Sequence, residues 1–316
     1  MKIYTIIVTY NGSPWIKKCL QSVTDSSIIS NILVIDNNST DNTTEIIKKE
    51  FNKVELIEAG QNLGFGKANN LGLRKAISEG SDYVFLLNQD AWVEKDTIKH
   101  LILKSNNYPD FSILSPMQFF NKKVLDFKFQ NYYENGKDFN ETIREVKFVN
   151  AAIWLIKTKN LISYGLFNEC FKHYGEDIEF CRRHISFKKR IGIVKNVIGF
   201  HERPQKEKVF NHKIIQRNLE IRILLAISRT KYNLTSNTKE NIKTTELKIL
   251  RNKVGDTNMG STRNNGFANY YNAIEGVPKL IINADIINPG DSSEARNSGS
   301  SYFYLMEVLI HQTLLM

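Results

Sequence analysis

The chain has 316 residues, of which 41% are apolar and 24% are charged, a balance typical of a folded protein with a sizeable core. This composition excludes a disordered chain, a collagen and a disulfide scaffold, and the three cysteines, Cys19, Cys170 and Cys181, have no paired spacing that indicates a zinc site. The net charge of +10 favours a polyanionic ligand: nucleic acid, anionic lipid headgroups or a phosphorylated substrate.

The N-terminus lacks the pattern of a signal peptide, because the apolar run in MKIYTIIVTYNG is short and ends in polar residues. No stretch reaches the roughly 18 to 20 apolar residues of a membrane-spanning helix, since even 302–316 is interrupted by Glu307, His311 and Gln312. We therefore expect a cytoplasmic protein, and leave open a peripheral contact with the inner face of the cell membrane.

Strand and helix patterns alternate strictly up to about residue 116. The predicted strands are continuous apolar runs, which indicates burial on both faces, and they span 2–9, 32–35, 54–57, 83–87 and 112–114. The predicted helices between them span 13–24, 41–50, 66–79 and 94–105. This alternation predicts the α/β class, with a mostly parallel, doubly wound central sheet flanked by helices.

Residues that commonly open helices precede two of these patterns. Ser13 with Pro14 lies at the opening turn of the first, and Ser39 or Thr40, with Glu45 following, stands ahead of the second. These signals place the preceding loops at the carboxyl ends of strands, which is the edge where such sheets bind ligands.

The pattern loosens after residue 116. Irregular strands and a loop are expected over 117–157, followed by a helix over 177–187, a strand over 191–200 and a basic amphipathic helix over 211–229. Residues from about 231 onward are rich in Asn, Thr, Ser and Gly. We predict one domain over 1–230, with halves 1–116 and 117–230, and a C-terminal appendage over 231–316 that is either a small helical or irregular subdomain or partly disordered.

Polar clusters follow the first two predicted strands. The first strand ends in Thr9, Tyr10 and Asn11, and the second ends in Asp36. Tyr10 offers an aromatic face on which a base can stack, and Asp36 can accept a hydrogen bond from a ribose hydroxyl or a base N–H. Ordinary turn chemistry accounts for the same residues equally well.

A glycine-rich segment, QNLGFGKANNLGL, lies between the third predicted strand and a helix. It is neither GxGxxG nor a P-loop, which argues against a nicotinamide enzyme and an NTPase. Gly64 and Gly66 at the start of a helix nevertheless suit close backbone approach to a phosphate or a ribose.

Three further positions carry acid–base or metal chemistry. Asp90 follows a buried strand, where a divalent cation can lie between it and a nucleoside diphosphate, although a helix cap is the alternative. Glu176 and Asp177 open a helix, as a capping pair or as a pocket with one general base. His201 ends a strand, and a lone histidine there is more often structural; its candidacy rests on Asp90 needing a partner.

Taken in order, seven blocks resemble the inverting glycosyltransferases of family 2, which have the GT-A fold, and within them the rhamnosyltransferase-like branch. The resemblance covers about residues 3–230. The blocks are IIVTYNG, VIDNNSTDNT, NLGFGKANNLG, LLNQDA, FVNAAIWLI, YGEDIEFCRR and GFHE.

The resemblance implies that 1–116 is the nucleotide-sugar-binding half and 117–230 the acceptor-binding and catalytic half. It assigns donor binding to residues that follow the first four strands: Thr9, Tyr10, Asn11, Asp36, Asn62, Gly64, Asn88 and Asp90. It places the acceptor and donor-sugar wall at Asn150, Ala151 and Ala152.

The family's Asp-x-Asp metal motif reads Asn88, Gln89, Asp90 in this chain. The amide at position 88 removes a charge that would hold a cation, so the resemblance leaves Asp90 and His201 as the protein ligands of Mg²⁺ or Mn²⁺. It also implies that Asp177 is the catalytic base, with Glu176 beside it shaping the acceptor pocket.

The implied reaction transfers a sugar, rhamnose in the branch, from a dTDP- or UDP-linked donor to a hydroxyl of a glycan or lipid-linked acceptor in cell-surface polysaccharide synthesis, with inversion at the anomeric carbon. Basic residues between 217 and 253 suit anionic headgroups, or are simply solvated helix faces. No zinc finger, RNP-like or helix-turn-helix motif points to nucleic acid.

Two alternatives remain. A sugar-nucleotide pyrophosphorylase has a similar nucleotide-binding sheet, but it needs a glycine-rich activating loop where this chain has NGSPW. A catalytically inactive nucleotide-sugar or glycan-binding module is kept open by Asn88, whereas Asp90, Asp177 and His201 argue against it.

Overall fold

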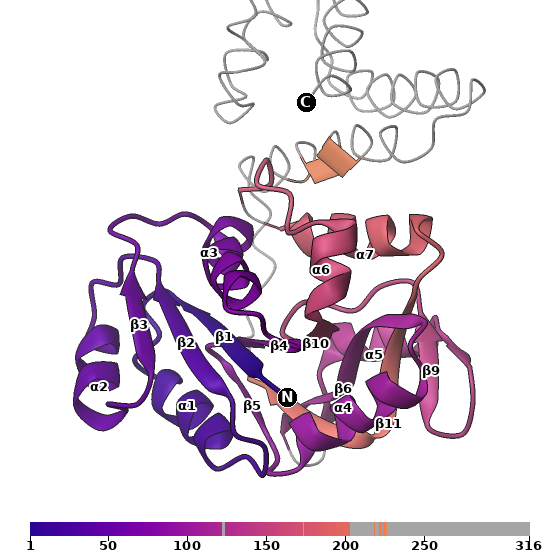
Figure 1. Cartoon of the computed structure of the whole chain (residues 1–316), viewed down its shortest axis with the longest axis horizontal. Coiled ribbons are helices and arrows are strands. Elements are labelled where there is room, and N and C mark those ends of the chain that lie inside the picture. The colour runs from indigo at the N-terminus through magenta and orange to yellow at the C-terminus, as the bar shows by residue number, and fades with distance from the viewer. Residues whose placement is uncertain (122–123, 173, 203–217, 219–220, 223, 226–316) are drawn as a thin grey trace, which may run out of the picture. The chain divides into compact units, whose positions relative to one another are not determined.

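The structure is a computed structural model that describes residues 1–121, 124–172, 174–202, 218, 221–222 and 224–225 (Figure 1). The predicted helix over 211–229 lies almost wholly outside these residues, and the appendage over 231–316 lies outside them entirely. In the part of the chain that is described, no helix is both long and apolar enough to cross a membrane.

The described strands form one mixed sheet of eleven strands. Along the main path, their order is β3 (Glu55–Glu58), β2 (Asn31–Asp36), β1 (Ile3–Thr9), β4 (Tyr83–Asn88), β10 (Ile153–Lys157), β6 (Phe111–Asn121), β11 (Arg190–His201), β9 (Ile143–Val146) and β8 (Lys137–Asp138). Two short strands pair off this path, β5 (Ala91–Val93) with β11 and β7 (Val124–Leu125) with β6.

The first half of the sheet is parallel, as the apolar runs predict. Strands β3, β2, β1 and β4 run in one direction, with Thr9 opposite Asp36 and Val8 opposite Asn88. The ends of three strands therefore meet at one edge of the sheet. The polar clusters that follow these strands are brought to that carboxyl edge.

The second half of the sheet is mixed, which agrees with the expected mostly parallel sheet and adds antiparallel strands that the sequence did not specify. Strand β10 runs antiparallel between β4 and β6, and β9 runs antiparallel to β11. The irregular region predicted over 117–157 thus contributes a buried central strand at its end. An apolar run indicates burial but carries no information on strand direction, so the sequence pattern misses this insertion.

Helices cover both faces of the sheet (Figure 1). Their bounds are α1 (Ile16–Thr24), α2 (Thr43–Glu50), α3 (Phe65–Ser78), α4 (Thr97–Asn107), α5 (Phe127–Glu134), α6 (Thr158–Tyr164) and α7 (Glu176–Ser186). Apolar residues of α1, α2 and α4 share one core with Ile7, whereas those of α3, α5, α6 and α7 share a second core with Ile6. Successive side chains of a strand point to opposite faces, so each buried strand supplies both cores.

The predicted helix starts are corrected by a few residues. Helix α1 begins only at Ile16, and Ser13 and Pro14 lie in the preceding turn. Helix α2 begins at Thr43, whose N–H donates to Asp41, while Ser39 bonds to Asp36 instead of capping. The side chains expected to cap α2 are used to join the loops at the sheet edge, a contact that local sequence does not reveal. Helices α5 and α6 were not predicted.

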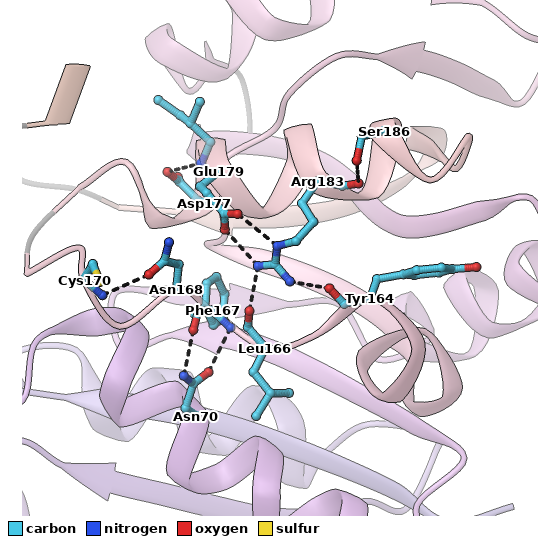
Figure 2. A network of polar contacts seen from close by, with 11 residues as sticks. Asn70, Tyr164, Leu166, Phe167, Asn168, Cys170, Asp177, Glu179, Arg183 and Ser186 are labelled. Carbon is cyan, nitrogen blue, oxygen red and sulfur yellow. Dashed lines mark hydrogen bonds and ion pairs between the residues drawn. The ribbon is translucent and has the colours of Figure 1, made fainter. Parts of the chain in front are cut away.

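A buried polar network fixes helix α7 (Figure 2). The side chains of Arg183 and Glu179 are only 5% and 1% exposed, and they pair twice, Nε to Oε1 at 3.0 Å and Nη2 to Oε2 at 2.8 Å. Arg183 also donates to the backbone carbonyls of Tyr164 and Leu166. Because a buried charge is tolerated only when it is paired and hydrogen-bonded, these bonds hold α7 against the 164–166 segment.

We expect Arg183→Met to lower the free energy of unfolding by about 3 to 5 kcal/mol, because it leaves the Glu179 carboxylate buried without its cation. Arg74→Met is the matched control: Arg74 pairs with Glu169 but its side chain is 56% exposed, so its loss should be at most about 1 kcal/mol. Urea unfolding of the three proteins measures both values. Equal losses would show that the buried pair holds α7 no more firmly than a surface pair.

Candidate active site

The loops after β1 and β2 are joined by their own side chains. Asp36 is 2% exposed and accepts hydrogen bonds from the Ser39 N–H at 2.9 Å and from its Oγ at 2.5 Å. Asn11 has a left-handed backbone, φ +48°; its N–H donates to Ser39 Oγ at 2.9 Å, and its Oδ1 accepts from the Thr40 N–H at 2.8 Å. The structure therefore brings Asn11 and Asp36 together, as predicted for one site.

Tyr10 and Thr9 differ in what they present to a ligand. The side chain of Tyr10 is 46% exposed, so its ring is open to a ligand. Thr9 is buried; its hydroxyl donates to Gln89 Oε1 at 2.6 Å, and its carbonyl accepts from the Asn37 N–H at 2.7 Å. Both polar groups of Thr9 are thus used within the protein, which makes it a support of the loop.

The segment with Asn62 and Gly64 lies beside the start of α7. Asn62 Oδ1 accepts from the Gly64 N–H at 2.9 Å. Gly64 has φ +79°, and a Cβ there would collide with the backbone carbonyl of Lys172, so glycine is required for both reasons. Asn37, which sequence reasoning did not single out, donates to the Gly64 carbonyl at 3.2 Å and accepts from the Leu63 N–H at 3.2 Å.

Asn88, Gln89 and Asp90, at the end of β4, make contacts with three different parts of the chain. The backbone N–H of Asn88 donates to the Ala152 carbonyl at 2.8 Å. Gln89 turns toward the β1 loop, and Asp90 turns toward His201. The sequence pattern assigned no role to Gln89. Its place directly after a buried strand was the feature that could have indicated a role at the site.

Asp90 and His201 meet, as predicted. His201 Nε2 lies 3.4 Å from Asp90 Oδ1, and the backbone pairing of β5 with β11 sets Ala91 opposite His201. His201 is buried at 4% exposure. Among the described residues no group of three or more His, Cys, Asp or Glu side chains gathers, so a cation at this pair would take its other ligands from a bound molecule or water. A carboxylate with an imidazole suits Mn²⁺, and the carboxylate alone suits Mg²⁺.

The predicted wall residues separate into two kinds. Asn150 Nδ2 lies 3.4 Å from His201 Nδ1, and Asn150 Oδ1 is buried with no hydrogen-bond partner among the described residues. Ala151 and Ala152 are buried, one in each core. Their side chains therefore contribute packing, and Asn150 lies behind the histidine.

The two adjacent carboxyls at the start of α7 have unequal surroundings. Glu176 is 6% exposed and its Oε2 has no hydrogen-bond partner in the described part of the chain. Burial, and secondarily the negative charge of Asp177, raise the pKa of Glu176 to about 8. Asp177 is only half-buried. Glu176 is therefore neutral at pH 7, and such a separation of environments is typical of paired carboxyls with different roles.

The start of α7 lies against the glycine segment. A Cβ built on Gly66 would lie 3.7 Å from the Cβ and Cγ of Glu176. The catalytic candidates on α7 thus stand beside the loop that follows β3. A surface pocket of about 650 Å³ lies elsewhere on the protein. It is lined among others by Tyr83, Lys157 and Ile162 and contains none of the candidate site residues.

The raised pKa of Glu176 gives a pH dependence. Between its ordinary value of 4.5 and about 8, Glu176 is ionised in the unfolded chain but protonated in the folded one, so its contribution to stability falls as pH rises and levels off above pH 8. We expect the free energy of unfolding of wild type, relative to Glu176→Gln, to fall between pH 5 and pH 8 by up to about 1.4 kcal/mol per pH unit. Urea unfolding of both proteins across this range measures the difference. A difference independent of pH would contradict the burial of a neutral carboxyl.

Comparison with known proteins shows the family of the chain. Residues 4–165, just over half of the chain, match the Glycosyl transferase family 2 domain. The low-salt glycan biosynthesis hexosyltransferase Agl10 of Haloferax volcanii is 27% identical over 215 residues, which cover 63% of this chain and 66% of Agl10. The dTDP-rhamnosyl transferase RfbF of Shigella flexneri is 25% identical over 206 residues, which cover 63% of this chain and 68% of RfbF. The match to Agl10 thus spans just under two thirds of that protein's length.

Solved structures share the fold. S. aureus TarS 1-349 in complex with UDP-GlcNAc has a TM-score of 0.57 at 20% identity, covering 89% of this chain and 82% of that one. The mannosyltransferase PcManGT from Pyrobaculum calidifontis, in complex with GDP-Man and Mn²⁺, has a TM-score of 0.56 at 15% identity, covering 98% and 86%. The prediction of fold class is confirmed: the α/β architecture, with its mixed and mostly parallel sheet, is the GT-A fold. From its sequence and its fold, the chain belongs to glycosyl transferase family 2.

Proposed function

We propose that this protein is an inverting glycosyltransferase that moves a sugar from a nucleoside-diphosphate sugar to a hydroxyl of a glycan or lipid-linked acceptor. The observation that carries the proposal is the packing of the start of α7, with Glu176 and Asp177, against the glycine segment at the carboxyl edge of the parallel strands. This contact puts the first turn of α7, which carries both carboxyls, beside the edge where α/β sheets bind nucleotides. Membership of family 2 supports the same reaction.

The donor is proposed from the relatives. RfbF is named a dTDP-rhamnosyl transferase, and the TarS structure holds UDP-GlcNAc, so dTDP- and UDP-linked sugars are the first candidates. The name of Agl10 also supports a role in glycan synthesis, which we propose to be the synthesis of a cell-surface polysaccharide. We propose a cytoplasmic location, where nucleotide sugars are present, with the acceptor at the membrane. The division into a domain over 1–230 and an appendage over 231–316 stays part of this proposal.

In the proposed mechanism, Asp177 removes the proton of the acceptor hydroxyl while that oxygen attacks the anomeric carbon. A bond forms between the acceptor oxygen and this carbon, and the bond from the carbon to the diphosphate oxygen breaks on the opposite face. The products are an inverted glycoside and a nucleoside diphosphate, with the proton on Asp177. Because burial raises the pKa of Glu176 to about 8, Glu176 is already protonated at pH 7, and the role of base is proposed for Asp177.

Asp90 and His201 fit a divalent cation, since one offers a carboxylate oxygen and the other an imidazole nitrogen 3.4 Å away. A bound Mg²⁺ or Mn²⁺ would neutralise the charge that develops on the departing diphosphate. The complex of PcManGT with Mn²⁺ supports a divalent metal in this fold. Asn88, which has a neutral side chain, is the last residue of β4 and stands two residues before Asp90.

Thermal unfolding in the presence of a panel of nucleotide sugars tests the function as a whole. A bound donor raises the unfolding midpoint by mass action, and transfer is then assayed with the stabilising donor. Donor binding without any transfer would favour an inactive binding module, and formation of a nucleotide sugar from a sugar phosphate would favour a pyrophosphorylase.

Asp177→Asn should lower the rate of transfer by at least about a hundredfold, because an amide keeps the shape of the side chain but accepts no proton. The affinity for the donor nucleotide should change little. Initial rates and calorimetric binding separate the two effects. Asp110→Asn is the control, since the side chain of Asp110 is 79% exposed and lies outside the site. Transfer by Asp177→Asn at the wild-type rate would place the base elsewhere.

Chelation should stop transfer, and added Mn²⁺ or Mg²⁺ should restore it. Asp90→Ala and His201→Ala should each weaken the binding of UDP or dTDP in the presence of Mn²⁺, because each removes one of the two proposed protein ligands. Calorimetric titration with and without Mn²⁺ measures this dependence. Full transfer in excess EDTA would show that basic side chains, and not a cation, neutralise the leaving group.

A further inference from the structure

Gln89, at the centre of the Asn88–Gln89–Asp90 segment, uses both atoms of its side-chain amide on the loop after β1. Its Oε1 accepts from Thr9 Oγ1 at 2.6 Å and from the Tyr10 N–H at 2.8 Å, and its Nε2 donates to the Tyr10 carbonyl at 3.2 Å. The amide therefore pairs with both polar backbone groups of Tyr10. This is the pairing that a neighbouring strand would provide.

The side chain extends the sheet by one step. The backbone ladder between β1 and β4 sets Val8 opposite Asn88, the last pair in its register. Strand β4 ends at that pair, whereas β1 continues to Thr9, which still pairs with Asp36 of β2. The Gln89 amide takes the place of a β4 strand partner for Tyr10. The conformation of the loop from Thr9 to Asn11 is thus set by a residue of the β4 loop.

The side-chain amide of Gln89 is tightly packed. A Cβ on Gly12 would collide with Gln89 Oε1 and with Thr9 Oγ1. The N–H of Gly12 is itself bonded to Thr43 Oγ1 at 2.8 Å. The loop therefore closes around the Gln89 side chain.

These contacts separate Gln89 from the proposed cation. Its Oε1 already accepts two hydrogen bonds, which is the number of lone pairs on an amide oxygen. Asp90, the next residue, turns instead to His201, with Oδ1 and Nε2 3.4 Å apart. The short segment thus directs one side chain to the β1 loop and the next to the candidate metal ligands.

We propose that Gln89 is a positioning residue for the nucleoside of the donor: it holds Tyr10 and Thr9 in the conformation that binds the nucleoside, and it does not ligate the cation. The inference rests on the proposed function. Tyr10 is 46% exposed, and its backbone N–H and carbonyl beneath the ring are both bonded to the Gln89 amide. A loop that is already ordered loses less freedom on binding, which strengthens the affinity for the nucleoside.

The test compares wild type with Gln89→Ala by calorimetry. UMP and dTMP in EDTA report the nucleoside contact without a cation, and UDP and dTDP with Mn²⁺ report the full site. We expect Gln89→Ala to weaken the binding of a mononucleotide and of its diphosphate by a similar factor, about tenfold, the effect of roughly one net hydrogen bond. The affinity of Mn²⁺ for the protein saturated with diphosphate should change less than twofold, whereas Asp90→Ala should weaken it strongly.

Three further variants distinguish a specific loss of nucleotide binding from a loss of folding. Gln89→Glu keeps the accepting oxygens, but it loses the donor to Tyr10 and places a negative charge beside the Tyr10 carbonyl, so it should bind UMP or dTMP more weakly than wild type does. Thr9→Val should weaken binding alone, but should add less than twofold in the Gln89→Ala background, because the two side chains act as one unit. Gln21→Ala, on the exposed face of α1, should bind as wild type does.

The outcomes distinguish this inference from the proposed function. If wild type binds none of the four nucleotides, the proposed function fails and the inference fails with it. If wild type binds but Gln89→Ala, with an unchanged unfolding midpoint, binds equally well, only the role of Gln89 is overturned. A loss confined to the affinity for Mn²⁺ would also overturn it, because Gln89 would then act on the cation.

Discussion

The buried ion pair of Glu179 with Arg183 is the constraint on which the position of helix α7 depends. Both charges are removed from water, so their mutual bonds and the bonds of Arg183 to two backbone carbonyls must all form together. Asn70 on α3 holds the following residue, Phe167, by two hydrogen bonds (Figure 2). Helix α7 is thereby tied through one short segment to α3, whose first turn follows the glycine loop.

This anchoring gives the two carboxyls on the first turn of α7 their unequal chemistry. Glu176 faces the protein interior near Gly66 and stays protonated at neutral pH, whereas Asp177 remains half-exposed. A similar division holds after β4, where Gln89 serves the β1 loop and Asp90 meets His201. In both places adjacent residues of one segment point to different surroundings, and their roles follow from those surroundings.

The sequence by itself determined the parallel half of the sheet and the edge at which the site lies. Continuous apolar runs and the polar residues that end them are local features, so the ends of β1, β2 and β4, with Thr9, Asp36 and Asn88, were placed correctly. The order of the seven blocks indicated the family. The resemblance also named Asp90 and His201 as a pair. Helix starts were less well predicted, because Ser39 and Thr40 bond to the neighbouring loop instead of capping α2.

Only the tertiary structure decided the features that depend on segments distant in the chain. Strand β10 enters antiparallel between β4 and β6, although its apolar pattern fits either direction. Asn150 lies behind His201, and Gln89 replaces a strand partner of Tyr10. Glu176 is neutral because other elements bury it. Hydrogen-bond partners and burial are set by what the fold brings near a side chain, so a residue's identity alone does not determine its charge or its role.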